Sequence, residues 1–389
     1  MKYYIIAGEA SGDLHGSNLM KGIYSQDSEA VIRFWGGDLM NEVFLKHEAT
    51  GGGLVRHYKE GAIMGFWEVF THAGKLLGNI GRCKKDILSW QPDIVILIDY
   101  PGFNFRIAGF THKRGIRTYY YIAPKVWASR EGRIRKLKEY VDRLYIVFPF
   151  EISYFKSKGV DAVYLGNPLV DSIAESRAMN ESREEFLKRN SLQDRPIIAM
   201  LAGSRKSEIG TMMPVLTEFA AKMRHIPEYS CYQFIIAGAP ARSMEDYAGY
   251  LKESYEESGV KVLFGETQSI IRHAEAAVVN SGTASLETVL LGTPQVVCYM
   301  GSWLSYTIAK HIIKVRYISL GNLIVDRLAF KELIQDDCTA ENIVSEVRSL
   351  IEDRAYREKM MAEYGKIKEA LGGTGASEAV AADMIRSVL

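Results

Sequence analysis

Four short segments of the chain place acidic, hydroxyl, amide or basic side chains beside glycine, and each follows a short apolar run. Such runs are typical of buried parallel strands. Because α/β proteins bind ligands at the carboxyl ends of parallel strands, we expect these segments to bind a ligand or to move a proton. The four segments are residues 8–13, 99–104, 203–209 and 280–287.

Asp99 follows the fully apolar run Ile94–Ile98 and precedes Tyr100 and Pro101. A carboxylate at the end of a buried strand is partly removed from water, which raises its pKa towards that of a useful general base. We therefore interpret Asp99 as the catalytic base. The residues alone are at least equally compatible with an Asx-type turn that leads into Pro101.

The segment that begins at Gly203 follows the apolar run 197–201 and leads into a predicted helix. Backbone amides, the Ser204 hydroxyl, the Arg205 guanidinium and a helix N-terminus would meet there, and this combination suits a diphosphate. The alternative is a capped helix with a solvated arginine.

The fourth segment follows the apolar run 276–279 and contains Ser281, Gly282 and Thr283. Their small side chains would let the backbone approach a phosphate. Glu287 falls in the first turns of the next helix, where its two oxygens could accept hydrogen bonds from a ribose. Two such loops in one half of the chain point to a nucleoside diphosphate.

The opening segment contributes Glu9, Ser11 and Asp13, which either cap a helix or contact a ligand. The chain lacks the Gly-x-Gly-x-x-Gly and P-loop patterns, which counts against a dinucleotide enzyme and a P-loop NTPase. Because the second half holds two better diphosphate loops, we interpret these three residues, with Asn104, as the acceptor side of the site, where they would bind sugar hydroxyls.

The elements that position these segments follow an α/β alternation. Apolar runs separated by helical stretches predict two successive parallel sheets, because the pattern restarts after Gly166-Asn167-Pro168. We expect two Rossmann-like domains facing across a cleft that holds the active site, residues 1–170 and 171–364. A last helix, within about 365–389, is a candidate to pack back on the first domain. The runs are 2–7, 31–35, 94–98, 117–122, 143–148, 161–165, 197–201, 232–237, 260–264, 276–279 and 294–299.

Composition excludes several classes of protein. The 389 residues are too many for one core, and a formal net charge of +1 gives no global field that would recruit nucleic acid. The four cysteines and eight histidines lack the spacing of a metal site, so we expect neither metal nor cofactor. No membrane-spanning run or targeting pattern is visible, so we expect a cytoplasmic protein that at most attaches to a membrane from outside.

Residues 63–77 place large apolar side chains at helical spacing. A core helix is the usual meaning of such a pattern. The alternative is an amphipathic contact with a membrane, supported by nearby basic residues. The candidate contact residues are Ile63, Met64, Phe66, Trp67 and Phe70.

Taken together, the motifs resemble the lipid A disaccharide synthase family, inverting glycosyltransferases of the GT-B fold. The similarity extends over nearly the whole chain. It rests on GEASGDLHG at 8–16, MGFWEVF at 64–70, IDYPGFN at 98–104, YYIAPKVWASREGR at 120–133, FPFE at 148–151, GNPLVD at 166–171, GSRKSEI at 203–209, SGTASLE at 281–287 and NLIVDR at 322–327.

The resemblance implies transfer of 2,3-diacylglucosamine from its UDP-activated form to the 6-hydroxyl of 2,3-diacylglucosamine 1-phosphate, with release of UDP. It implies that Asp99 removes the acceptor proton and that Arg205, Glu287 and Asn322 hold UDP. Because both substrates are amphiphiles, it also favours the membrane interpretation of 63–77. The implied setting is peripheral attachment to anionic lipid on the cytoplasmic face of the inner membrane, with a homodimer as a further possibility.

The chain departs from the family pattern at several positions. Ala202 stands where the family usually has proline, Gly102 replaces a common aspartate, and Asn167 replaces a common histidine. Lys125 lies in a run, residues 123–129, that also differs. Two alternatives remain open at this point: a UDP-sugar epimerase on the same scaffold, and a non-catalytic protein that binds a nucleotide or a lipid.

Overall fold

The computed structural model describes residues 1–47, 51–61, 69–127, 131–251, 259–301 and 316–388. The chain divides into two compact units, each with its own parallel sheet. Unit 1 comprises Met1–Asp171 and Gly372–Leu389, and unit 2 comprises Ser172–Leu371. The chain thus returns to unit 1 at residue 372.

The sheet of unit 1 has seven parallel strands in the order β3-β2-β1-β4-β5-β6-β7. Its central strands are apolar on both faces, because helices cover both sides of the sheet. The strands are β1 (Lys2–Ala7), β2 (Val31–Gly36), β3 (Gly53–His57), β4 (Ile94–Ile98), β5 (Arg117–Tyr121), β6 (Arg143–Ile146) and β7 (Ala162–Tyr164).

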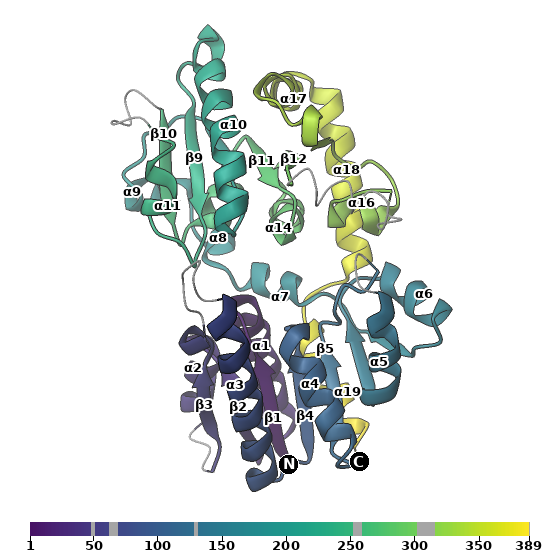
Figure 1. Cartoon of the computed structure of the whole chain (residues 1–389). Coiled ribbons are helices and arrows are strands. Elements are labelled where there is room, and N and C mark those ends of the chain that lie inside the picture. Colours follow the sequence, from purple (N-terminus) through teal and green to yellow (C-terminus); the bar gives the residue numbers. More distant parts are fainter. Residues whose placement is uncertain (48–50, 62–68, 128–130, 252–258, 302–315, 389) are drawn as a thin grey trace. The chain divides into compact units, whose positions relative to one another are not determined.

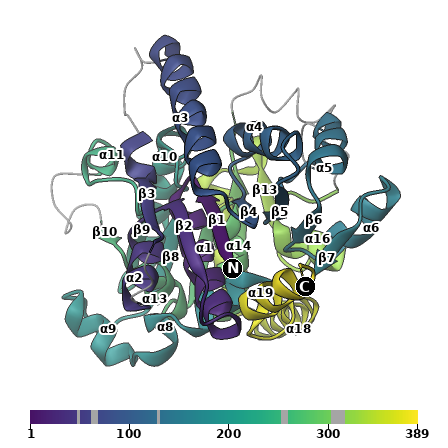
Figure 2. The same cartoon turned by 90° about the horizontal axis from the view of Figure 1, so that it is seen from below.

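The helices of unit 1 form two layers, visible in Figure 2 with α3, α4 and α5 on one side of the strands and α1, α2 and α19 on the other. Each layer encloses its own cluster of buried apolar side chains. The helices are α1 (Ala10–Gln26), α2 (Asp38–Lys46), α3 (Val69–Trp90), α4 (Pro101–His112), α5 (Ile134–Tyr140), α6 (Phe150–Ser157), α7 (Pro168–Ala174), which crosses the unit boundary, and α19 (Ala376–Arg386).

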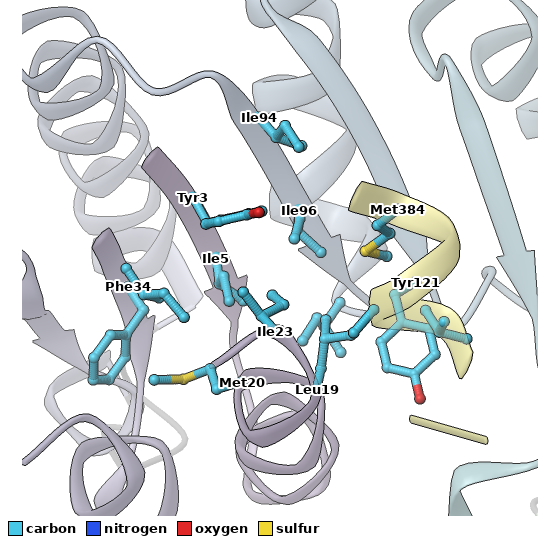
Figure 3. Close-up of a cluster of buried hydrophobic side chains, with 14 of the residues drawn as sticks. Tyr3, Ile5, Leu19, Met20, Ile23, Phe34, Ile94, Ile96, Tyr121 and Met384 are labelled. Carbon is cyan, nitrogen blue, oxygen red and sulfur yellow. The ribbon is translucent and has the colours of Figure 1, made fainter. Parts of the chain in front are cut away.

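Helix α19 packs directly on α1. A Cβ added at Gly22 would lie 3.0 Å from the Cβ of Ala381, so glycine is what permits this approach. Figure 3 shows Met384 of α19 beside Ile96 of β4, in the same cluster as Leu19 of α1. The C-terminal helix is therefore part of the core that supports the centre of the first sheet.

The sheet of unit 2 has six parallel strands in the order β10-β9-β8-β11-β12-β13. Figure 1 labels β10, β9, β11 and β12 of this sheet. Strands β8 and β11 are buried throughout, as their apolar sequences predict. The strands are β8 (Ile197–Leu201), β9 (Gln233–Gly238), β10 (Val260–Phe264), β11 (Ala276–Asn280), β12 (Gln295–Tyr299) and β13 (Glu332–Ile334).

The helices of unit 2 differ from expectation near the C-terminus. The charged, amphipathic sequence of 340–364 predicts one helix there, but the structure has two, which meet at Asp353, and the second continues to Leu371. The short strands β3 and β13 were not anticipated. The helices are α8 (Arg177–Asn180), α9 (Arg183–Arg189), α10 (Lys206–Arg224), α11 (Glu245–Ala248), α13 (Thr267–Arg272), α14 (Thr283–Leu291), α16 (Leu320–Val325), α17 (Ala340–Glu352) and α18 (Arg354–Leu371).

Each sheet reverses its strand order once, and the predicted site segments lie at these reversals. In unit 1 the reversal lies between β1 and β4, which are neighbours in register, with Ala7 opposite Ile98. In unit 2 it lies between β8 and β11, with Leu201 opposite Val279. Loops that leave adjacent strands in opposite directions open a crevice at such a point, where α/β proteins bind ligands.

Candidate functional site

The turn that carries Asp99 is held in an unusual backbone conformation. Asp99 has φ 42°, and Tyr100 has φ 45° and ψ 52°, so two consecutive non-glycine residues lie in the left-handed region. Each such residue costs on the order of 1–3 kcal/mol and persists only where the surrounding structure holds it. Pro101 then begins α4, which fixes where the turn must end.

Two buried side chains hold this turn through the backbone carbonyl of Asp99. The Asn104 Nδ2 donates to that oxygen at 2.8 Å and to the Ile98 carbonyl at 3.2 Å. The Tyr120 hydroxyl donates to the Asp99 oxygen at 2.6 Å. Asn104 and Tyr120 are both fully buried. Asn104, expected to face the acceptor, therefore binds its own backbone.

The opening turn lies against Asp99. A Cβ added at Gly8 would lie 2.3 Å from the Tyr100 ring, so the residue at position 8 must be glycine for this contact. Glu9 and Ser11 are exposed. A small pocket is lined by Gly8, Glu9, Ser11, Gly12, Ile98, Asp99 and Tyr100. The structure thus brings together the predicted base and two of the predicted acceptor residues.

The charge state of Asp99 is set by its neighbours. Burial raises the pKa of Asp99, the Glu9 carboxylate raises it further, and the Lys125 ammonium opposes the rise. The Lys125 Nζ lies 5.8 Å from the centre of the Phe148 ring. A half-buried carboxylate with a raised pKa that lines a small pocket is suited to general-base catalysis.

Asp13 does not face this pocket. Its carboxylate is buried and accepts hydrogen bonds from the backbone amides of Gly37 at 2.7 Å, and of Leu39 and Met40 at 3.1 Å each. These amides belong to the N-terminal end of α2. Asp13 therefore caps a helix, as one of the two sequence interpretations allowed, but the helix is α2 and not its own.

In unit 2 the two predicted phosphate loops meet at the strand-order reversal. Gly203 has φ 100°, and a Cβ there would lie 2.7 Å from the Asn280 Nδ2 at the end of β11. The Arg205 side chain is 79% exposed and its guanidinium lies 3.1 Å from a Glu208 oxygen. The same Glu208 carboxylate accepts hydrogen bonds from the backbone amides of Ser204 and Arg205. A phosphate that binds here would replace the Glu208 carboxylate as the acceptor of these hydrogen bonds.

The second loop opens helix α14. Gly282 and Thr283 are exposed at its N-terminus, where the first amides have no acceptor within the helix. The Ser281 amide donates to the Cys298 carbonyl, which ties the loop to β12. Burial raises the pKa of Glu287, while a hydrogen bond from Gln268 lowers it. The loop thus offers an anion site and a carboxylate within two turns of one helix.

Asn322 is fully buried, and all four hydrogen-bonding positions of its amide are occupied. Its Nδ2 donates to the Phe330 carbonyl and to Glu332, and its Oδ1 accepts from the amides of Ala329 and Phe330. In this arrangement the Asn322 side chain binds its own chain and has no hydrogen-bonding position left over. A contact between this side chain and UDP would require some of these hydrogen bonds to be exchanged, and the role of Asn322 in holding UDP stays a prediction.

Sequence reasoning missed several side chains that lie at these loops. Tyr120 holds the Asp99 turn, and the Arg242 Nε donates to the Ser204 carbonyl at 3.1 Å. Glu151 is buried and accepts hydrogen bonds from the Trp127 indole and from two backbone amides, and burial raises its pKa to about 7. Tyr120 and Glu151 belong to motifs on which the family resemblance rests. The sequence therefore marked both residues, but it did not indicate what either side chain does.

The predicted membrane contacts lie largely outside the described residues. This holds for Ile63, Met64, Phe66 and Trp67. The backbone of Phe70 lies in α3, and the structure does not describe its side chain.

A family model described as lipid-A-disaccharide synthetase matches residues 3–384. The chain belongs to this family. Among curated relatives, the lipid-A-disaccharide synthase of Geobacter metallireducens is 36% identical over 377 residues, which are 97% of this chain and 94% of the relative. That of Syntrophus aciditrophicus is 36% identical over 381 residues, 97% of this chain and 95% of the relative.

Solved structures share the architecture at low sequence identity. UDP-GlcNAc 2-epimerase from Neisseria meningitidis, bound to UDP-GlcNAc, has a TM-score of 0.71 at 13% identity and covers 99% of this chain and 100% of its own. The glycotransferase of kitacinnamycin has a TM-score of 0.55 at 13% identity, with 100% and 99% covered. These likenesses concern the fold alone and confirm the expected two-domain α/β class. Family membership confirms the enzyme class, a glycosyltransferase of lipid A disaccharide synthesis.

Proposed function

We propose that the chain transfers 2,3-diacylglucosamine from its UDP-activated form to the 6-hydroxyl of 2,3-diacylglucosamine 1-phosphate. The product is a β-1′,6-linked disaccharide 1-phosphate, and UDP is the leaving group. The observation that carries this proposal is the family match over residues 3–384. The likeness to epimerases does not compete with it, because at 13% identity a shared fold says nothing about the reaction.

On the acceptor side, we assign the proton transfer to Asp99. The ionised carboxylate takes the proton of the 6-hydroxyl as that oxygen attacks the anomeric carbon of the donor sugar. Glu9 and Ser11 are assigned to the acceptor hydroxyls, because both are exposed beside Asp99 and line its pocket. Asp13 and Asn104 are left out of direct contact, since both are committed to backbone groups.

On the donor side, we assign the diphosphate to the two loops that meet in unit 2. The segment Gly203–Arg205 supplies amides and a guanidinium, and Ser281, Gly282 and Thr283 supply hydroxyls and the N-terminus of α14. The positive end of that helix offsets the charge that develops on UDP as the sugar leaves. Glu287 is assigned to the ribose hydroxyls.

Product analysis with and without acceptor tests the function. Purified protein in detergent micelles is expected to form disaccharide and UDP only when UDP-diacylglucosamine and the monosaccharide 1-phosphate are both present. Conversion of UDP-N-acetylglucosamine in the absence of acceptor would instead identify an epimerase. Binding of UDP with no turnover of either mixture would identify a non-catalytic binding protein.

We further propose peripheral attachment to anionic lipid at the cytoplasmic face of the inner membrane, through the apolar side chains of 63–70. In the part of the chain that the structure describes, no helix has both the length and the apolar character to cross a bilayer. Attachment would place the enzyme where two acylated substrates reside. A homodimer is a separate proposal that sedimentation of the purified chain would test.

Replacing Phe66, Trp67 and Phe70 by serine is expected to weaken flotation with phosphatidylglycerol-containing vesicles at least several-fold. The physical reason is the loss of apolar area that would otherwise enter the interface, worth about 25 cal/mol per Å². Leu328→Ser is the control, because Leu328 is an exposed apolar side chain in unit 2. If the folded triple variant and the folded control floated equally well, residues 63–70 would be interpreted as part of the protein core and not as a membrane contact.

A further inference from the structure

We propose that Tyr120 and Asn104 are positioning residues for the catalytic base, which they hold by clamping the carbonyl of Asp99 in its left-handed turn. The inference rests on the proposed function, because it gives Asp99 the role of base. Neither side chain touches a substrate in this account, since both are fully buried. They act on the reaction only through the backbone of Asp99.

The clamp consists of two donors on one oxygen. The Tyr120 hydroxyl reaches the Asp99 carbonyl at 2.6 Å from the neighbouring strand β5, and the Asn104 Nδ2 reaches it at 2.8 Å from the first turn of α4. The Asp99 amide in turn donates to the Tyr121 carbonyl at 3.2 Å. The amide and the carbonyl of Asp99 are thus both hydrogen-bonded to β5, so this strand fixes the backbone of the turn.

The clamp is needed because the conformation that it holds is unfavourable. Asp99 and Tyr100 both have positive φ, a region that L-residues other than glycine rarely adopt. The carbonyl that receives both donors belongs to the peptide group between these two residues. Rotation of this peptide group changes ψ of Asp99 and φ of Tyr100, so loss of the two donors would free the turn to leave the conformation that presents Asp99 to its pocket.

The sequence supports a specific role for the Tyr120 hydroxyl. Tyr119, Tyr120 and Tyr121 alternate between the two faces of β5, and Tyr120 alone of the three belongs to the cluster on the α4 side. Burial and the Asp99 charge raise the pKa of Tyr120 well above its ordinary value. Its hydroxyl therefore remains a donor throughout any practical pH range.

Tyr119 provides the matched control. Its hydroxyl is 2.7 Å from that of Ser387, so Tyr119→Phe removes one partly buried hydrogen bond from the same strand but on the opposite face. Both variants lose a single oxygen and keep the ring. A difference in catalysis between them therefore reports the location of the hydroxyl and not the general cost of losing one.

Steady-state kinetics of disaccharide formation by the full-length chain test the inference. Tyr120→Phe is expected to lower kcat by about 10- to 100-fold, the scale of a small misplacement of a reacting group, with KM and UDP affinity unchanged. The acidic limb of the pH profile is expected to move to lower pH, because a carboxylate released towards water regains a more ordinary pKa. Glu9 and Lys125, the charges that act on Asp99, and Arg133, which acts on Tyr120, are unaltered in this variant.

Tyr119→Phe should show the wild-type kcat and pH profile. If Tyr120→Phe matched Tyr119→Phe in both, the inference would be overturned while the proposed function stood, provided that the wild-type chain makes disaccharide. Absence of product from the wild-type chain would overturn the function itself.

A double-mutant cycle tests the proposal without relying on the kinetics of Tyr120→Phe alone. If Tyr120 acts through the base, Tyr120→Phe should cause no further loss in an Asp99→Asn background. An equal fold-loss in both backgrounds would show a structural effect and would contradict the proposal. Should Tyr120→Phe fail to fold, Asn104→Ser is measured in the same cycle, with the same two outcomes.

Discussion

Replacement of Asp99 by asparagine is expected to lower kcat for disaccharide formation by about 10²- to 10⁴-fold, the range that general-base catalysis contributes. The amide has the shape of the carboxylate but cannot take the proton of the acceptor hydroxyl. The affinity for UDP should be unchanged, because the donor loops belong to unit 2. Initial rates from product analysis, and UDP titration by calorimetry, measure the two quantities.

The pH profile of the wild-type enzyme tests the role of Asp99 independently of any substitution at that residue. The base must be ionised, so activity is lost as pH falls through the pKa of Asp99. Burial and Glu9 raise that pKa, which places the acidic limb above the value for an ordinary aspartate. Removal of Glu9 by a Glu9→Gln change should therefore move the limb to lower pH.

Asp93 is the control for Asp99. It lies at the other end of β4, where it is exposed and accepts a hydrogen bond from the Lys2 amide. Asp93→Asn should retain the wild-type kcat and acidic limb. An Asp99→Asn enzyme that kept more than about a tenth of the wild-type kcat would be incompatible with general-base catalysis by this residue.

Glu287→Gln is expected to weaken UDP binding by about 10- to 150-fold and to raise the KM for the UDP-sugar in proportion. A carboxylate that accepts hydrogen bonds from two ribose hydroxyls contributes about 1.5–3 kcal/mol through each charge-assisted bond, and glutamine keeps only one acceptor. Because burial raises the pKa of Glu287, wild-type affinity should also fall as the pH is lowered towards that pKa. Calorimetric titration with UDP measures both effects.

Glu218→Gln is the matched control for the donor site. Glu218 is an exposed glutamate of α10 whose nearest basic partner is Lys222, at 3.4 Å. Its replacement should leave UDP affinity and the KM for the UDP-sugar at wild-type values. Unchanged UDP affinity in Glu287→Gln would remove Glu287 from the nucleotide site and leave the loops of α10 and α14 to be tested separately.

The position of the candidate site segments in the two sheets could be predicted from the sequence, because strand ends are easy to recognise. Asp99 and Gly203 each follow an apolar run, and the structure places both at strand-order reversals. The role of Tyr120 could not be predicted in this way. Its hydroxyl bonds to a backbone carbonyl on a neighbouring strand, and no side-chain pattern encodes that contact.

Asp13 and Asn322 show why residue type alone does not define a role. Both are polar residues in motifs of the family pattern, and both were expected to face a substrate. The partners that occupy Asp13 are amides of a helix more than twenty residues away in the chain. Those of Asn322 lie on the loop that leads into β13 and at the first residue of that strand. Only the folded arrangement reveals that these polar groups are already satisfied.

The linkage of the product is the most direct test of the central claim, that the acceptor 6-hydroxyl displaces UDP from the anomeric carbon and forms a β-1′,6 bond. Wild-type protein given UDP-diacylglucosamine and the monosaccharide 1-phosphate should yield one UDP per disaccharide, and proton NMR of that disaccharide should show a β-1′,6 linkage. An α linkage, or UDP released without disaccharide, would contradict the account.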